Sequence, residues 1–233
     1  MWNPSTREFT FTEGPIFAGL VLADEINRTP PKTQSALLEA MAEKQVTVEG
    51  TTFPLPRPFH VLATSNPIEY EGTYPLPEAQ LDRFMMRVSA GYLEPANEAQ
   101  VLVRRIARRQ EETTVEPVTD AADVLALQRG VESVDVDPSV IDYCVNLASA
   151  TRDHRSVEVG ASPRGSLALL LVSRALAVLD GRDFVLPEDV KSIAVPALAH
   201  RLTLTAEAWT SQVNPVDIVR EILDRVPGPA SAR

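Results

Sequence analysis

Two adjacent acidic residues, Asp24 and Glu25, are the side chains of this chain with the clearest capacity for chemistry. They end a short apolar run, residues 20–23, which follows a Gly-Pro turn and Gly19. This pattern predicts a strand buried on both faces of a parallel sheet. Open α/β sheets bind ligands at the carboxyl ends of their strands, where one carboxylate can hold Mg²⁺ and the next can activate a water molecule. Taken alone, the run favours a plainer interpretation, a strand followed by a solvated acidic turn.

Asn66 ends the next predicted strand, residues 59–64, and is a second candidate for chemistry. A neutral amide can donate a hydrogen bond to a phosphate or a water molecule without adding charge beside a carboxylate. The alternative is an Asx turn before Pro67, for which an Asn-Pro pair is well suited. The two interpretations are compatible, because one amide can serve both purposes.

The elements that must position these side chains alternate between strand and helix up to about residue 91, and this order predicts an α/β fold. The expected elements are a strand at 7–12 within a hairpin, a helix at 32–45, a hairpin at 46–53, strands at 59–64 and 85–90, and a short helix at 78–84. The strand at 85–90 is expected to be a third core strand of the parallel sheet.

From Pro95 onward the pattern is nearly all helical, and several of the helices are opened by proline. The expected helices cover residues 98–110, 121–128, 138–150, 163–179, 187–201 and 215–226. In the first of these, Val101, Leu102 and Ile106 are expected to face inward. We therefore predict two domains, an α/β piece at 1–91 and an all-α domain at 92–233.

The composition limits the classes of function. A chain of 233 residues with 44% hydrophobic residues can bury a core, and its net charge of −10 argues against broad binding to nucleic acid. The single cysteine, Cys144, allows no internal disulfide and is expected to be a buried, inert thiol. Three scattered histidines form no recognisable metal site. No apolar run is long enough to span a bilayer and no signal peptide opens the chain, so we expect the cytoplasm.

Three motifs in order carry a resemblance that covers essentially the whole chain. They are DEINRTPPKTQSALLEAM at residues 24–41, VLATSNP at 61–67 and LPEAQLDRF at 76–84. Together they closely resemble the MoxR family of AAA+ ATPases. The resemblance implies a partial P-loop core, whose parallel sheet lacks its N-terminal strands, followed by an all-α lid domain. The related magnesium-chelatase ATPase subunit shares these motifs, but the run at 24–41 fits MoxR better.

The resemblance assigns roles to the residues at the strand ends. Asp24 and Glu25 are similar to the Walker B pair, with Asp24 for Mg²⁺ and Glu25 as the catalytic carboxylate. Asn66 is similar to the sensor 1 residue, which positions the γ-phosphate of ATP and the attacking water. The implied cofactors are therefore ATP and Mg²⁺.

Two arginines complete the implied site. Arg83 resembles an arginine finger, which reaches across a subunit interface to a transferring phosphoryl group. The alternative is a surface arginine paired with Glu78 or Asp82. Arg164 resembles the sensor 2 arginine of the lid, at a helix start where Ser162 is a plausible N-cap. A cation is unfavourable at a helix N-terminus, so a bound anion would offset its cost there. Whether Arg164 acts within its own subunit or on a neighbour is left open.

The 233 residues contain no Walker A motif, because none of the three lysines follows a glycine. In the family this motif and the strand that feeds it precede the Walker B strand, so we expect them N-terminal to Met1. Without that strand, the strands at 59–64 and 85–90 would have unpaired edges. We expect either a fragment of a longer ATPase or, as the less favoured reading, a short chain that completes its sheet from a partner.

The resemblance implies an ATPase that assembles in a ring, expected to be a hexamer, and remodels or matures client proteins. One class of client partner in relatives carries a von Willebrand factor A domain. We expect the present chain to hydrolyse little or no ATP alone. The rival from another class is a non-catalytic interaction module that assembles with a full-length paralogue or regulates it.

Overall fold

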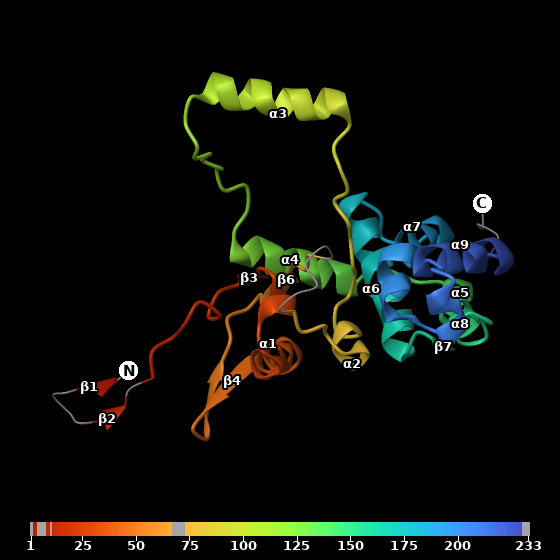
Figure 1. Ribbon diagram of the computed structural model, residues 1–233, viewed down its shortest axis with the longest axis horizontal. Helices are drawn as coiled ribbons and strands as arrows, with labels where there is room; N and C mark the ends of the chain where they lie inside the picture. The colour runs from red at the N-terminus through yellow and green to blue at the C-terminus, as the bar shows by residue number, and fades with distance from the viewer. Residues whose placement is uncertain (1, 4–7, 10, 67–72, 230–233) are drawn as a thin grey trace.

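The computed structural model describes residues 2–3, 8–9, 11–66 and 73–229. It shows a small α/β part, a compact group of helices, and one helix, α3, that stands apart from both (Figure 1). Within the described residues, no helix is long and apolar enough to cross a membrane. The expected order, an α/β part followed by an all-α part, is confirmed.

The α/β part is built from short elements. They are β1 (Trp2–Asn3), β2 (Glu8–Phe9), β3 (Leu20–Ala23), η1 (Ile26–Arg28), α1 (Pro31–Glu43), β4 (Gln45–Val48), β5 (Thr51–Pro54), β6 (His60–Ala63) and α2 (Glu78–Leu81). Strands β3 and β6 are parallel, with Ala23 opposite Ala63, and β4 and β5 form the expected hairpin. Strands β1 and β2 pair antiparallel, although residues 4–7 and 10 of this predicted hairpin lie outside the described residues.

The β3–β6 pair is covered on one face only. Val21 and Val61 pack with the small core formed by Ala40, Leu55 and Phe59. On the opposite face Leu20, Leu22 and Leu62 are 63%, 63% and 57% exposed. The prediction of strands buried on both faces is therefore wrong for the described residues, because no element among them covers this second face.

Residues 85–90 do not form the predicted third core strand. They have no regular secondary structure and pair with no strand in the described part of the chain, and Met85, Met86 and Val88 are exposed. The Arg87 amide instead donates to the carbonyl of Pro196 in the helical part, at 2.9 Å. A strand forms only when a neighbour satisfies its backbone groups, and here that neighbour is not among the described residues.

Helix α3 (Pro95–Arg108) contradicts a second prediction. Val101, Leu102 and Ile106 were expected to face inward, but they are 53%, 62% and 75% exposed, and no residue of α3 is buried. The helix has one apolar side, yet nothing among the described residues packs on it (Figure 1). Periodicity correctly identified a helix with an apolar side, but it could not show whether that side has a cover.

The helical part has a continuous hydrophobic core. Its elements are α4 (Ala121–Glu132), α5 (Pro138–Arg152), β7 (Val157–Val159), α6 (Pro163–Leu179), α7 (Pro187–Leu198), η2 (Ala199–Arg201), β8 (Thr203–Leu204), α8 (Ala206–Thr210) and α9 (Pro215–Arg225). Tyr143, Leu147, Leu169, Leu198 and Ile222 are almost fully buried in it. The short β7–β8 pair and α8 were not predicted, because elements of two to five residues carry too little periodic signal.

Prolines start the long helices as predicted. Helices α5, α6 and α9 each begin with proline, and the side chains of Asp137, Ser162 and Asn214 cap them. Cys144 is buried in α5, and burial raises the pKa of its thiol to about 11. The prediction of a buried thiol is confirmed, and a raised pKa disfavours the thiolate, which is the reactive form.

Two glycines give a matched test of this packing. A Cβ on Gly160 would lie 2.6 Å from the backbone nitrogen of Arg152, whereas a Cβ on Gly130 would meet open space on α4. We expect Gly160→Ala to lower the free energy of unfolding by about 1–3 kcal/mol through overpacking. We expect Gly130→Ala to raise it by about 0.5–1 kcal/mol, because alanine is the better helix former. Denaturant unfolding of both variants checks this, and an unaffected Gly160→Ala would contradict the packing.

Candidate active site

Thr64 joins the ends of the two parallel strands. Its hydroxyl donates to Asp24 Oδ1 at 2.5 Å and accepts from the Glu25 amide at 2.8 Å. Its backbone amide donates to the carbonyl of Ala23 at 3.0 Å, and its carbonyl accepts from the Ile26 amide at 3.0 Å. Sequence reasoning passed over Thr64, although its place directly after a strand and beside the acids was an available signal. This residue fixes where the two acids leave the sheet.

Glu25 adopts an unusual backbone conformation. Its φ and ψ are both 49°, in the left-handed region, and it is the residue that caps the short helix η1. A non-glycine residue there costs on the order of 1–2 kcal/mol, and such strain concentrates at functional sites. The carboxylate accepts from Arg28 Nη1 at 3.2 Å, with both side chains well exposed, so this ion pair contributes little to stability. The chain thus turns sharply at Glu25 while the carboxylate stays near solvent.

Asn66 lies two residues beyond Thr64, on the same end of the strand pair, and is half-buried. The structure therefore brings together three of the five predicted site residues, Asp24, Glu25 and Asn66, at the carboxyl ends of β3 and β6. This edge is where parallel sheets bind their ligands.

The two predicted arginines lie elsewhere. Arg83 and Arg164 line one pocket of about 410 Å³, together with Asp82 and Arg201. Its other walls come from α6, from Phe84 and Met85, and from the end of α1 and the start of β6. The residues from these last two elements and the segments beside them are Met41, Ala42, Lys44, Phe59, His60 and Val61. The arginines are therefore near the amino end of β6, whereas the acids follow the carboxyl ends of β3 and β6. The five residues form two groups at opposite ends of the strand.

Asp82 lies between the two arginines in this pocket. Its carboxylate accepts from Ser162 Oγ at 2.9 Å and from Arg201 Nη1, and it lies 3.7 Å from Arg164 Nη1. The predicted N-cap role of Ser162 is confirmed, since its hydroxyl accepts from the Arg164 amide at 3.1 Å. The negative charge that offsets Arg164 at the start of α6 is supplied here by Asp82. Of the two predicted alternative partners of Arg83, Glu78 and Asp82, the Asp82 carboxylate thus contacts three other groups.

The residues at the strand ends fit Mg²⁺ in part. Asp24, Glu25, Thr64 and Asn66 offer oxygen atoms, which Mg²⁺ prefers. Within the described ranges, however, no three His, Cys, Asp or Glu side chains gather so as to hold a metal ion by themselves. Mg²⁺ in phosphate-transferring sites typically takes one or two carboxylates, with phosphate oxygens and water as its other ligands, and this donor set is compatible with that arrangement. No glycine-rich loop for the phosphates is present in the sequence.

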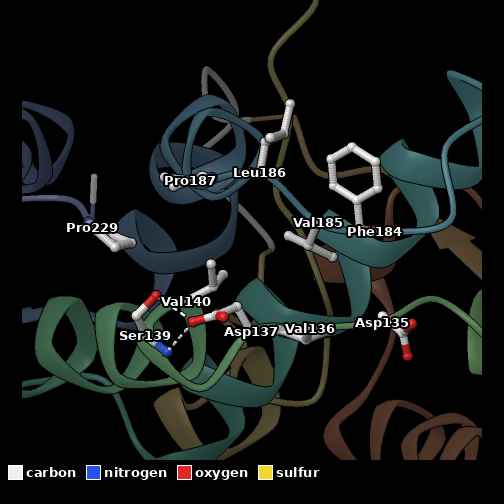
Figure 2. Close-up of a pocket in the computed structure, with 10 residues that line it drawn as sticks. All are labelled: Asp135, Val136, Asp137, Ser139, Val140, Phe184, Val185, Leu186, Pro187 and Pro229. Carbon is white, nitrogen blue, oxygen red and sulfur yellow. Dashed lines mark hydrogen bonds between the residues drawn. The ribbon is translucent and has the colours of Figure 1, made fainter. Parts of the chain in front are cut away.

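A larger pocket, of about 530 Å³, lies in the helical part (Figure 2). Its polar groups include Asp137 and Ser139 beside Val140, Val185 and Pro187. The Asp137 carboxylate is already used, because it accepts from the Ser139 amide at 2.8 Å and from the Ser139 hydroxyl at 2.6 Å. These two bonds, the hydroxyl first, lower the pKa of Asp137. The pocket therefore holds a helix cap whose carboxylate is already bonded, with the Asp135 side chain at its edge.

Parallel strands with acids at their ends, followed by a helical lid, are typical of the AAA+ class of ATPases. The comparisons with known proteins agree. Residues 1–86 match the family model for ATPases associated with various cellular activities (AAA), and residues 149–222 match the model for the AAA lid domain.

Three similar proteins refine the class. The uncharacterised protein YeaC of Bacillus subtilis is 49% identical over 98% of this chain and 71% of its own length. The chaperone MoxR1 of Mycobacterium tuberculosis is 40% identical over 97% of this chain and 62% of its own length. A crystal structure of a candidate ATPase from Cytophaga hutchinsonii is 40% identical, with a TM-score of 0.90 over 99% of this chain and 72% of the other. The chain belongs to the MoxR family of AAA+ ATPases.

His200 provides a pH test of the contact between the α/β and helical parts. Its Nε2 lies 3.2 Å from the carbonyl of Phe84, and burial, then the charge of Arg201, lowers its pKa to about 4. Between pH 6.5 and about 4 the unfolded chain binds a proton that the folded chain does not. The free energy of unfolding should therefore fall as the pH falls through this window, by about 3 kcal/mol at most.

Denaturant unfolding at pH 7 and pH 5 measures this loss. His200→Gln should remove most of the difference between the two pH values, and His60→Gln, at an exposed position, should leave it unchanged. A wild-type pH dependence that survives His200→Gln would contradict the assignment.

Proposed function

We propose that this chain forms part of a MoxR-type ATPase whose catalytic sites are shared between neighbouring subunits of a ring, a hexamer by analogy with the class. One observation carries the proposal. Asp24, Glu25 and Asn66 follow the carboxyl ends of the strands, whereas Arg83 and Arg164 lie near the amino end of β6. A subunit arranged in this way presents acids at one end and arginines at the other.

The acidic end acts on the subunit's own nucleotide. Asp24 holds Mg²⁺, which when bound with ATP neutralises charge on the phosphates. Glu25 orients the attacking water and accepts its proton. Asn66 donates to the γ-phosphate or to that water. The Thr64 hydroxyl fixes the two acids relative to β6, since it bonds both the Asp24 carboxylate and the Glu25 amide.

The arginine end acts on the nucleotide of the next subunit. Arg83 and Arg164 line one pocket, and the Arg164 side chain is 55% exposed, so both can meet an anion presented from outside. Guanidinium groups suit this role because they stay charged and bind phosphate oxygens in pairs. Such a contact is heterologous, and heterologous contacts that close form rings. We therefore assign Arg164, like Arg83, to the neighbouring site.

The work done by hydrolysis is the remodelling or maturation of client proteins in the cytoplasm. The relative MoxR1 is named a chaperone, and this supports a chaperone-like role here. We expect the client complex to include a protein with a von Willebrand factor A domain, as the family resemblance implies. Nucleic acid is not an expected partner, because the net charge of −10 opposes it.

A second candidate function is a non-catalytic module that assembles with a full-length paralogue or regulates it. The exposed face of Leu20, Leu22 and Leu62, which a partner chain could cover, favours it. Such a module would keep its arginine end and could complete a paralogue's site without hydrolysing ATP itself. The two functions differ in whether Glu25 matters for activity.

The first test is ATP hydrolysis by the purified 233-residue chain. We expect no activity above background, because the residues that cradle the phosphates are not in this sequence. Glu25→Gln should therefore change nothing in the chain alone. Hydrolysis by the wild-type chain that disappears in Glu25→Gln would overturn this expectation.

The second test asks whether the arginines act on a neighbour. The chain is mixed with a family member that carries a Walker A motif but whose residues equivalent to Arg83 and Arg164 are alanine. We expect the wild-type chain to restore hydrolysis, and Arg83→Ala to lower this stimulation by roughly a thousandfold or more, as for other arginine fingers. Arg220→Ala, at an exposed position on α9, is the matched control and should stimulate normally. Equal stimulation by Arg83→Ala would contradict the proposal.

A further inference from the structure

Asp82 occupies an unusual position, because it directly precedes Arg83 in the chain and contacts the segment that carries Arg164. The family resemblance draws attention to the two arginines and gives Asp82 no role. In the structure, however, the Asp82 side chain contacts three residues of the lid: Ser162 and Arg164 at the start of α6, and Arg201 in η2. We call Asp82, Ser162, Arg164 and Arg201 the Asp82 network.

On the Arg164 side, Asp82 acts through the cap of helix α6. The Ser162 hydroxyl donates to Asp82 Oδ2 at 2.9 Å, and Ser162 Oγ in turn accepts from the Arg164 amide at 3.1 Å. A hydroxyl has one hydrogen, so the bond to Asp82 fixes its rotamer and directs its lone pairs toward the helix. Asp82 also attracts the Arg164 guanidinium directly, at 3.7 Å. The start of α6 and the side chain of Arg164 are thereby tied to the residue before Arg83.

On the Arg83 side, Arg201 secures the turn that carries Asp82 and Arg83. Its Nη1 donates to the carboxylate of Asp82 and, at 2.7 Å, to the Asp82 carbonyl. Its Nη2 donates to the carbonyls of Phe84 at 2.7 Å and Met85 at 3.5 Å, and its Nε to that of Ala197 at 2.7 Å. All five N–H groups of the guanidinium have acceptors, an arrangement that lysine cannot reproduce.

The charges in the Asp82 network leave the outer arginines available. The Arg201 side chain is only 2% exposed and bonds Asp82 closely, so it balances the carboxylate from the inside. Arg164 lies farther from the Asp82 carboxylate than Arg201 does, at 3.7 Å, and its side chain is 55% exposed. Arg83 is also exposed. An anion arriving at the pocket would therefore meet the outward charges of Arg83 and Arg164, beside Lys44, with the carboxylate already neutralised behind them.

We propose that Asp82 is a positioning residue that sets Arg83 and Arg164 as one unit, and that buried Arg201 holds Asp82 in place. This inference rests on the proposed function of the two arginines. It adds that lid and α/β part must be joined through Asp82 for both arginines to reach one phosphate group. Misplacement of a catalytic group by about 1 Å can lower a rate a hundredfold, so the expected effect is large.

The activity test uses the full 233-residue chain mixed with the arginine-depleted, Walker A-bearing family member. Asp82→Asn should lower the maximal stimulated rate about 10- to 100-fold. The chain concentration that gives half-maximal stimulation should stay unchanged, because assembly is unaffected. Asp217→Asn makes the same charge change at an exposed pair on α9 and should have no effect. Full stimulation by Asp82→Asn would overturn the inference.

A double-mutant cycle separates positioning from general weakening. Ser162→Ala removes the link from Asp82 to the α6 cap but leaves the Arg201 bonds intact, so it also serves if Asp82→Asn fails to fold. We expect Ser162→Ala and Arg164→Ala each to lower the maximal rate, and the double variant to be no slower than Arg164→Ala alone. Losses that multiply would show that Ser162 does not act through Arg164 and would overturn this part of the inference.

Hydrogen exchange of the unmixed chain gives a readout that does not depend on activity. The amides of Arg83, Phe84 and Arg87 are bonded to carbonyls at 2.9–3.1 Å. Arg201→Lys should speed their exchange, and Asp217→Asn should not. Unchanged exchange in Arg201→Lys would overturn the role of Arg201. If the wild-type chain itself gives no stimulation, the proposed function fails and the catalytic part of this inference with it, while exchange still decides whether Arg201 holds the turn.

Discussion

The ion pair between buried Arg201 and partly buried Asp82 is the interaction on which the arrangement of this chain depends. Arg201 comes from the lid and Asp82 from the end of the α/β part, and their bond is joined by two further contacts between the parts, from His200 and from the Arg87 amide. A buried charge must be paired and fully hydrogen-bonded to be tolerated. Removing either partner typically costs about 3–5 kcal/mol, because the other charge stays behind without a partner. The relative position of lid and sheet is therefore fixed at the arginine pocket.

This constraint separates the two halves of the chemistry. The acids stand where the parallel strands end, at positions set by the Thr64 hydroxyl. The arginines stand at the other end of β6, at positions set by Asp82 and Arg201. Each group is organised by one polar side chain that bonds two segments far apart in sequence. Under the proposed function, a site divided in this way needs a second subunit, so that catalysis depends on assembly.

The exposed apolar surfaces are the other consequence of the arrangement. Leu22 and Leu62 on the sheet, Val88 beyond α2, and Ile106 on α3 are all exposed among the described residues. Isolated apolar residues on a surface are ordinary, but whole faces of a sheet and a helix are not. The chain spans 71% and 62% of the lengths of two relatives that it matches, YeaC and MoxR1. The ATPase activity is therefore proposed for the whole protein and not for these 233 residues alone.

Much of the fold was predictable from local signals. Prolines at first helical positions located α5, α6 and α9, Ser162 marked the start of α6, and a short apolar run before two acids located β3. What failed depends on distant partners. The sequence of residues 85–90 favours a strand, but a strand needs a neighbour. The apolar side of α3 predicts burial, but it can be buried only if another element packs against it, and none of the described residues does. Thr64, Asp82 and Arg201 were missed because their importance lies in contacts across 39 to 119 residues of sequence.

The most direct test of the shared site is a distance. Leu167→Cys places a spin label beside the arginine pocket, Ser65→Cys places one beside the acids, and the buried Cys144 stays unlabelled. Each labelled chain is mixed with the Walker A-bearing, arginine-depleted family member, with ATP and Mn²⁺ in place of Mg²⁺, and the distance from label to metal is measured. The account predicts a short distance for the label at 167 and a long one for the label at 65. A short distance only at 65 would contradict it, because the arginines would then lie away from the neighbour's phosphates.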